Sequence, residues 1–343
     1  MTGPIKRDRG WPRLAYNLCW LAEHVAGDGA IGARLGEARE SLALHATRAV
    51  SPNATRTLQV ARRRDLSPDE FRREYLGPGI PVVLEGFATD WPAARKWTPA
   101  FFAENHGDVP IQLINAAVED LDGDQYDPAG RTTTVAQVVA AIEAGERDYP
   151  RFVPLLHLRP ELQRDFDAAA LLALRGTLSL ETMFQFFMGG AGTNTALHGA
   201  IPNNFFVQVY GRKQWWIYPP ASTPVFRPPM LRATYFMSPV DVAAEGDRRE
   251  AGLEAVQGWT TVLEPGDVLY NPPFYWHQVH NLTTTIGVGM RWFGVASILR
   301  SSVTQTLLTL MSTNPPVWRA RRNRTDFVKN FTESRPARVR RPS

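Results

Sequence analysis

The strongest constraint on the fold is a succession of short apolar or alternating segments between residues 183 and 293. Glycine and proline separate these segments, as at Pro219-Pro220 and Pro265-Gly266, and no helical periodicity lies between them. Short segments with such turn signals are typical of strands in a β-sandwich or β-barrel. The predicted strands are Met183–Met188, Asn204–Tyr210, Trp215–Tyr218, Thr260–Leu263, Val268–Tyr270 and Ile286–Phe293.

Helices are expected on both sides of this strand-rich region. Apolar residues recur at three- and four-residue steps from about Trp11 to Ala49, and a final helix is expected near Val295–Met311. A short helix is expected to begin at Ser67, because this serine precedes proline and two acidic residues. We therefore expect a helical leader and connector over residues 1–64, a mainly β domain over 65–311 and a basic, flexible tail over 312–343.

The positive charge of the chain is concentrated at its end. Residues 319–343 hold nine basic and two acidic side chains, whereas the whole chain carries +4, so the first 318 residues are net −3. A body without a basic field argues against nucleic-acid binding. The single cysteine, Cys19, excludes a disulfide framework, and no apolar run is long enough to span a membrane. With no secretory signal pattern at its start, we expect a cytoplasmic protein.

Two of the seven histidines stand out through their neighbours. His198 follows a glycine-rich turn and precedes a predicted strand, and His277 follows a turn, a strand, a proline pair and three aromatic residues. Two histidines on neighbouring barrel strands suit a non-haem iron site, where neutral imidazoles hold a divalent metal with open positions for oxygen and a co-substrate. On spacing alone, two buried structural histidines explain the pattern equally well.

Longer stretches around these histidines resemble a known family. The runs Thr195–Lys213 and Pro265–Leu282, together with the segment Gly79–Trp97, are similar to the JmjC-like cupin family of Fe(II)- and 2-oxoglutarate-dependent oxygenases, which includes the asparaginyl hydroxylase of hypoxia-inducible factor. The likeness covers about Asp65–Gly294. It implies a mainly β protein whose core is a double-stranded β-helix of the cupin or jelly-roll type, with flanking helices.

The resemblance also implies roles for individual side chains. His198 and His277 match the two metal-binding histidines of the family. Lys213 matches the lysine that pairs with the distal carboxylate of 2-oxoglutarate, and Thr195 matches the hydroxyl that assists it. Asn204 matches the asparagine beside the metal-binding end of the co-substrate. The implied cofactors are Fe(II), 2-oxoglutarate and O2.

The chain departs from the family at the third metal ligand. The family pattern is His-x-Asp or His-x-Glu, whereas this chain has His198-Gly199-Ala200. In radical halogenases of other Fe(II)/2-oxoglutarate subfamilies, alanine or glycine replaces the aspartate and a halide binds the iron. We therefore expect a radical halogenase with chloride in the position vacated at Ala200, which makes Ala200 part of the catalytic site. The alternatives are a hydroxylase or other oxygenase with an atypical metal site, and a non-catalytic cupin binding protein.

The substrate is expected to be a small molecule or a peptide. The polar, proline-rich segment Arg227–Glu254 is expected to be a substrate-selecting lid. Arg291 is a further candidate for binding the co-substrate, with a surface salt bridge as its alternative role. The terminal helix is a candidate homodimer contact, as in related hydroxylases, although simple packing of this helix is equally consistent with the sequence.

Overall fold

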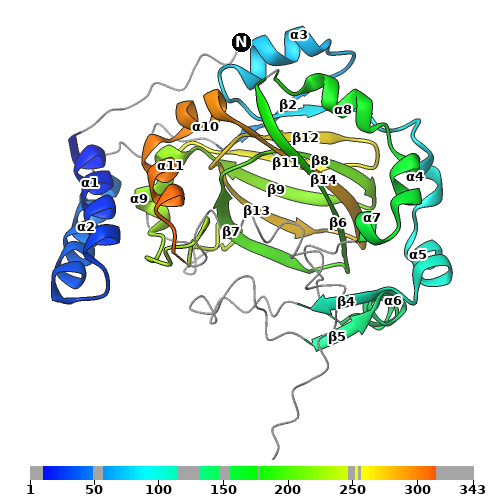
Figure 1. Cartoon of the computed structure of the whole chain (residues 1–343), viewed down its shortest axis with the longest axis horizontal. Helices are drawn as coiled ribbons and strands as arrows, with labels where there is room; N and C mark the ends of the chain where they lie inside the picture. The colour runs from blue at the N-terminus through cyan, green and yellow to red at the C-terminus, as the bar shows by residue number, and fades with distance from the viewer. Residues whose placement is uncertain are drawn as a thin grey trace, which may run out of the picture.

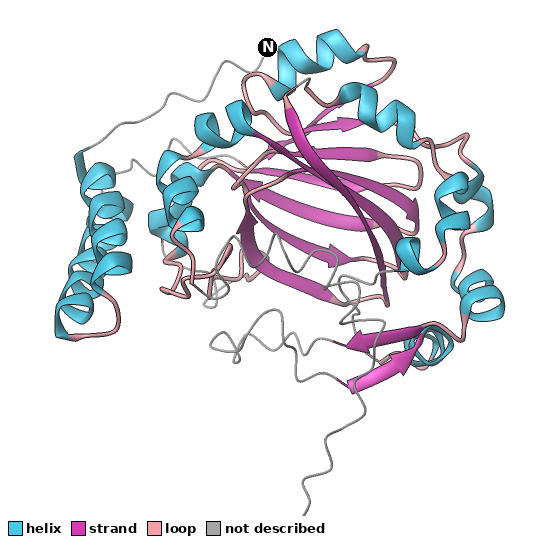
Figure 2. Ribbon diagram, viewed as in Figure 1, coloured by secondary structure: helices cyan, strands magenta, loops and turns pink. Residues whose placement is uncertain are grey.

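Two six-stranded sheets lie face to face at the centre of the molecule (Figures 1 and 2). The computed structural model describes residues 11–48, 57–113, 131–146, 155–176, 178–245, 252–253 and 256–313. The first sheet contains, in spatial order, β1 (Leu58–Gln59), β11 (Trp259–Leu263), β9 (Lys213–Tyr218), β13 (Trp276–Asn281), β7 (Asn194–Ala200) and β10 (Tyr235–Met237). The second contains β2 (Ala61–Arg63), β3 (Val82–Leu84), β12 (Val268–Asn271), β8 (Asn203–Tyr210), β14 (Thr285–Gly294) and β6 (Ser179–Gly189).

Successive strands of the central region alternate between the two sheets. β7, β8 and β9 lie in the first, second and first sheet, and β11 to β14 alternate in the same way. Neighbouring strands run antiparallel, except that β1 is parallel to β11 and β2 is parallel to β3. This arrangement is a double-stranded β-helix, and it confirms the fold class predicted from the sequence. Each of the six predicted strands is present within a few residues of its expected bounds.

Helices cover the outer faces of both sheets, and a small hairpin lies beyond them (Figure 1). The hairpin pairs β4 (Pro110–Leu113) with β5 (Arg131–Thr134). The helices are α1 (Trp11–Ala26), α2 (Ala30–Arg48), α3 (Pro68–Phe71), α4 (Pro92–Lys96), α5 (Pro99–His106), α6 (Val135–Glu143), α7 (Leu155–Leu158), α8 (Ala168–Leu174), α9 (Thr223–Phe226), α10 (Val295–Ser301) and α11 (Val303–Leu310). As expected, α3 begins after Ser67, whose side chain and that of Glu70 form a reciprocal capping box.

The leader is helical over the expected residues and forms a hairpin of the two helices α1 and α2. The chain turns between α1 and α2 at Gly27, whose positive φ of 78° suits glycine. Arg39 of α2 holds the hairpin together and fixes it to the barrel domain. Its guanidinium donates to Glu23 at 2.6 Å, to the hydroxyl of Tyr16 at 3.0 Å and to the carbonyl of Pro228 at 3.0 Å.

The final helix is likewise divided. α10 and α11 meet at Ser302, whose extended backbone (φ −160°, ψ 109°) ends the first helix. The Ser302 hydroxyl accepts a hydrogen bond from the backbone N–H of Gln305 and so caps α11. The proposed homodimer contact at these helices and the domain boundaries stay predictions, and the expected basic tail lies outside the described residues beyond residue 313.

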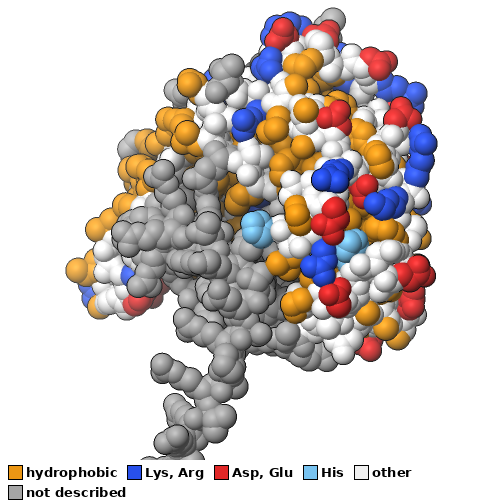
Figure 3. All heavy atoms as spheres, turned by 45° about the vertical axis from the view of Figure 1, so that its right-hand side comes forward, with side chains coloured by type: hydrophobic (Ala, Val, Ile, Leu, Met, Phe, Trp, Pro, Cys, Tyr) orange, Lys and Arg blue, Asp and Glu red, His pale blue; other side chains and the backbone are white. Residues whose placement is uncertain are grey.

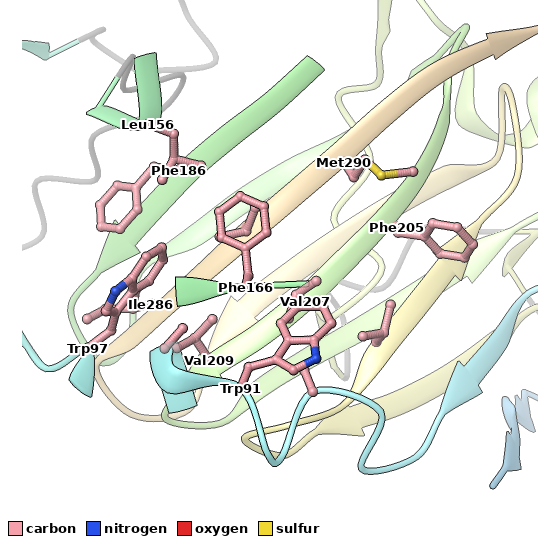
Figure 4. Close-up of a cluster of buried hydrophobic side chains, with 14 of the residues drawn as sticks. Trp91, Trp97, Leu156, Phe166, Phe186, Phe205, Val207, Val209, Ile286 and Met290 are labelled. Carbon is pink, nitrogen blue, oxygen red and sulfur yellow. The ribbon is translucent and has the colours of Figure 1, made fainter. Parts of the chain in front are cut away.

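The largest apolar core lies between the second sheet and the helices that follow β2 (Figure 4). Phe205 of β8 is fully buried in this core, with rings of Phe71, Tyr270 and Trp292 at centroid distances of 5.3, 5.7 and 4.8 Å. A second core lies between the outer face of the first sheet and the helices α1, α2, α9, α10 and α11. A third apolar cluster fills part of the space between the two sheets.

The outer surface over the helices carries charges of both signs. Arg72 pairs with Asp69 at 2.7 Å, and Arg159 pairs with Asp108 at 2.9 Å. The face in Figure 3 shows acidic and basic side chains interspersed. Among the described residues, no helix is both long enough and apolar enough to cross a membrane.

The first prediction concerns the core around Phe205. We expect Phe205→Ala to lower the free energy of unfolding by about 3–5 kcal/mol, because the substitution leaves a cavity among three aromatic rings. Tyr210→Ala, in an exposed position of the same strand, is the control and should cost less than about 1 kcal/mol. Urea unfolding measures both values, and equal losses would contradict this assignment of the core.

Candidate metal and co-substrate site

The two predicted histidines meet between the sheets. His198 on β7 and His277 on β13 are directly opposite each other in the antiparallel pairing, so both side chains lie on the same face. Their ring centroids are 4.1 Å apart with an angle of 50° between the planes. Each residue is 6% exposed. The structure therefore brings together two buried imidazoles from segments almost eighty residues apart in the chain.

Hydrogen bonds orient both imidazole rings. The Nδ1 atom of His198 lies 2.9 Å from the carbonyl of Ala196, and that of His277 lies 2.9 Å from the carbonyl of Tyr275. A carbonyl accepts a hydrogen bond from the Nδ1–H group, and this tautomer leaves the lone pair on Nε2 for a metal. Burial lowers the pKa of His277 to about 4, and the positive charge of Arg291 acts in the same direction. His277 is therefore neutral near pH 7, as a metal ligand must be.

Position 200 provides no third ligand. Ala200 lies two residues beyond His198 on β7 and is buried, and its cross-strand neighbour is Tyr235 of β10. Alternation along a strand places residues 198 and 200 on the same face. No group of three or more histidine, cysteine, aspartate or glutamate side chains close enough to hold a metal occurs in the part of the chain that the structure describes.

Lys213 begins β9 at one end of the same interior. It follows Gly211, whose φ of 71° forms the tight turn from β8 and where a Cβ would lie 1.9 Å from the carbonyl oxygen of Thr284. Lys213 is 1% exposed, and its Nζ lies 4.5 Å from the ring centroid of Phe206. Its partner on β13 is Asn281. Asn281 lies four residues from His277, which is a distance of about 13 Å along the strand.

A β-bulge brings Thr195 to the same face as His198. These residues are three apart on β7, so plain alternation would send them to opposite faces. The pairing with β13 shifts at this point: His198 faces His277 and Thr195 faces Val279. Between these two pairs β7 has one residue more than β13. This bulge turns the side chain of the buried Thr195 to the interior face, between the histidines and Lys213.

Several buried polar atoms around the histidines have no hydrogen-bond partner within the protein. They include Oδ1 of Asn204, Oε1 of Gln185 and Nε1 of Trp215. The Trp215 ring stacks on that of His277 at 5.5 Å with an interplanar angle of 17°. Because an unpaired buried polar group costs free energy, such atoms indicate a site built for a polar ligand. Asn204 was expected from the sequence, whereas Gln185 was not.

Tyr235 and Arg291 also belong to this site. The ring of Tyr235 stacks on His198 with centroids 5.5 Å apart and planes within 10°. Nη1 of Arg291 donates to the Tyr235 hydroxyl at 3.2 Å.

The segment Arg227–Glu254, expected to be a lid, also contributes to the barrel. Its described part includes β10, a strand of the first sheet. The β-prone run Thr234–Met237 was the signal that could have identified this strand.

The residues present fit a divalent metal and a dianionic co-substrate. Two buried imidazoles offer nitrogen donors of the kind that iron, zinc and related metals bind. The buried Lys213 of the first sheet and the unpaired amide oxygen of Asn204 of the second sheet come from strands on opposite sides of the interior, where a short diacid would find a cation for one end. His198 and His277 would provide two of the three side-chain ligands expected of a His-x-Asp site.

Comparison with known protein families agrees with this geometry. A family model described as a cupin-like domain matches residues 68–296, which is about two thirds of the chain. The chain belongs to the cupin-like domain family. The match begins at the helix capped by Ser67 and ends in α10, so it contains both sheets apart from β1 and β2.

Curated relatives of this cupin-like chain are oxygenases and demethylases by name. A lysine-specific demethylase 8 from Xenopus tropicalis is 28% identical over 66% of this chain and 51% of its own length. The 2-oxoglutarate and iron-dependent oxygenase JMJD4 of Homo sapiens is 27% identical over 67% of this chain and 61% of its own. The human bifunctional peptidase and (3S)-lysyl hydroxylase JMJD7 is 23% identical over 71% and 86%. The chain spans about half the length of the first of these relatives.

These names bear on the choice between halogenation and oxygenation. They give no support to the expected halogenase or to chloride as a cofactor. They agree better with the alternative, an oxygenase that uses iron and 2-oxoglutarate. The halogenase expectation came from Ala200 alone. The absence of a carboxylate at this position does not identify the ligand that binds there instead.

A metal-binding experiment tests the histidine pair. We expect His198→Ala and His277→Ala each to weaken the binding of Co(II), a stable substitute for Fe(II), by more than about 100-fold, because each removes one of two protein ligands. Isothermal titration calorimetry measures the affinity. His280→Ala on the opposite face of β13 is the control and should bind Co(II) as the unaltered protein does. Unchanged affinity in either of the first two variants would remove that histidine from the site.

Proposed function

We propose that this chain is a non-haem Fe(II)- and 2-oxoglutarate-dependent oxygenase that oxidises a side chain of a peptide or protein, or a small molecule. The observation that carries the proposal is the pair His198 and His277, buried and face to face on adjacent strands of a cupin-like barrel. The named relatives support both the cofactors and a peptide or protein substrate.

In this proposal each side chain of the site has a distinct task. Nε2 of His198 and of His277 would hold the metal, and the carbonyls of Ala196 and Tyr275 keep both rings in the required orientation. Lys213 would bind the distal carboxylate of 2-oxoglutarate, with the Thr195 hydroxyl beside it. The apolar wall that includes Phe206 keeps water from the lysine and so strengthens this ion pair.

The remaining polar groups would orient the other end of the co-substrate. Asn204 offers an amide on the interior face of β8, and Trp215 fixes the ring of His277 by stacking. When bound, iron and 2-oxoglutarate supply the oxidation of a C–H bond by O2, with release of succinate and CO2. The barrel supplies a dry, shaped space in which the reacting groups are held together.

Halogenation is the second candidate, and Ala200 is the observation that favours it. Its methyl group supplies no negative charge beside the two histidines, so an anion bound there would have to come from solution. Chloride in that place would make the chain a radical halogenase. The relatives do not favour this outcome, so we place it behind oxygenation.

Turnover of the co-substrate tests the proposed function. We expect purified protein with Fe(II), O2 and 2-oxoglutarate to form succinate, and Lys213→Met to raise the KM for 2-oxoglutarate by about 100-fold, because a buried charge-assisted pair is lost. Succinate is quantified by NMR. Lys96→Met, which removes a half-exposed lysine on α4, is the control and should leave this KM unchanged. The absence of both succinate formation and 2-oxoglutarate binding would favour a non-catalytic binding protein.

The products distinguish the two candidate reactions. With a peptide library as substrate and equal amounts of chloride and bromide present, we expect mass spectrometry to find additions of one oxygen atom and no halogen isotope pattern. Products that carry chlorine and bromine in proportion to the halide supplied would overturn oxygenation in favour of halogenation.

A further inference from the structure

A buried amide from the second sheet lies against one of the two histidines. Asn271 is the last residue of β12, is 3% exposed and is directly opposite Asn204 in the antiparallel pairing with β8. Nδ2 of Asn271 lies 3.2 Å from Nδ1 of His277. Since directly opposite residues point to the same face, Asn271 is a neighbour both of the histidine and of the amide proposed to orient the co-substrate.

Nδ1 of His277 contacts two groups with opposite requirements. The carbonyl of Tyr275, 2.9 Å away, only accepts hydrogen bonds, so it needs a proton on Nδ1. An amide NH2 group only donates, so Nδ2 of Asn271 needs a lone pair on the same nitrogen. The second arrangement places the ring proton on Nε2, where it blocks a metal, and leaves the Tyr275 carbonyl facing a lone pair.

Rotation of the Asn271 amide by 180° removes this conflict. The nitrogen and oxygen of an amide are nearly equal in size, so the rotated group occupies the same space. Oδ1 then accepts from Nδ1–H of His277, which shares its proton between this oxygen and the carbonyl of Tyr275. Without the rotation, Oδ1 of Asn271 is buried with no hydrogen-bond partner among the described residues, and that cost is removed as well.

The neighbouring Asn204 offers a partner for the other end of the rotated amide. Its Oδ1 atom is also buried and lacks a hydrogen-bond partner in the part of the chain that the structure describes. Directly opposite residues of an antiparallel pair have Cβ atoms about 5 Å apart, which is within reach of two short amides. After the rotation, Nδ2 of Asn271 is a donor in need of an acceptor, and Oδ1 of Asn204 is an acceptor in need of a donor.

We propose that Asn271 is a positioning residue that couples the metal site to the co-substrate site. Its Oδ1 accepts from Nδ1–H of His277 and so holds the tautomer that leaves Nε2 for the metal. Its Nδ2 donates to Oδ1 of Asn204, which leaves the NH2 group of Asn204 to donate to the anionic co-substrate. The inference rests on the proposed function, because the two sites that Asn271 connects are those proposed for the metal and for 2-oxoglutarate.

Two substitutions separate the acceptor of Asn271 from its donor. Asn271→Asp keeps an oxygen toward His277 and loses the donor toward Asn204, whereas Asn271→Leu loses both in a similar volume. Isothermal titration calorimetry of the full chain measures the Kd for Co(II), and then the Kd for 2-oxoglutarate in protein saturated with Co(II).

The two variants have different expected results. We expect Asn271→Leu to raise both Kd values by about tenfold, because it removes a hydrogen-bond partner behind a metal ligand and another behind the co-substrate. Asn271→Asp should bind Co(II) at least as tightly as the unaltered protein, because a carboxylate accepts well from Nδ1–H of a metal-binding histidine. It should raise only the Kd for 2-oxoglutarate, again by about tenfold.

Asn203→Leu is the control for the loss of a buried amide. Asn203 also lies on β8, is fully buried and forms hydrogen bonds with Ser297 and Tyr270 on the helix-covered side of the sheet. This variant should unfold at a lower urea concentration and should keep both Kd values. A purely structural role of Asn271 would instead make its two variants resemble this control.

NMR of metal-free protein labelled with 15N-histidine gives a second measurement. The 15N shifts of the ring show which nitrogen of His277 carries the proton. We expect the proton on Nδ1 in the unaltered protein and in Asn271→Asp, and partly on Nε2 in Asn271→Leu, where one of its two acceptors is lost.

The outcomes separate this inference from the proposed function. Weaker Co(II) binding or unchanged 2-oxoglutarate binding in Asn271→Asp would overturn the positioning role alone, and this variant decides the matter even if Asn271→Leu does not fold. A proton on Nε2 of His277 in the unaltered, metal-free protein would overturn it too. Failure of the unaltered protein to bind Co(II) and 2-oxoglutarate would overturn the proposed function and the coupling together.

Discussion

The pairing of β7 with β13 is the constraint on which the site depends. It places His198 opposite His277, and a shift of one residue in either strand would turn one imidazole out of the interior. The bulge in the same pair then lets Thr195 face inward as well. Burial of the surrounding apolar side chains on both sheets fixes this register, so the geometry of the polar residues is determined by the packing of the apolar ones.

The parts of the fold that could be predicted are those where local sequence and tertiary structure agree. Strands such as β8 and β14 alternate between the helix-covered core and the interior, and β8 is also limited by Pro202 and Gly211, so their pattern is evident in the sequence. Lys213 could be recognised for a related reason: the turn before it requires glycine, and the hairpin fixes its distance from His198 along the chain.

The parts that could not be predicted depend on contacts between distant segments. Nothing in the sequence near Thr195 shows which of two neighbouring residues the bulge absorbs, since only the partner strand decides it. Tyr235 lies in a three-residue strand within a proline-rich segment, too short for its alternation to be distinctive, and its place beside His198 comes from pairing with β7. The break between α1 and α2 was visible as Gly27 and Gly29, but helix-forming residues on both sides obscured it.

The contacts of the leader hairpin support a strand of the site, although the hairpin itself is remote from the histidines. Trp20 of α1 packs edge-on against Phe236 at 5.5 Å, and Arg39 of α2 donates to the carbonyl of Pro228. Phe236 is the outward-facing neighbour of Tyr235 on β10, so the two helices support from behind the strand that carries the phenol. A chain trimmed to its barrel would leave that edge strand without backing, and the chemistry of the pocket would change through a part of the molecule that never touches it.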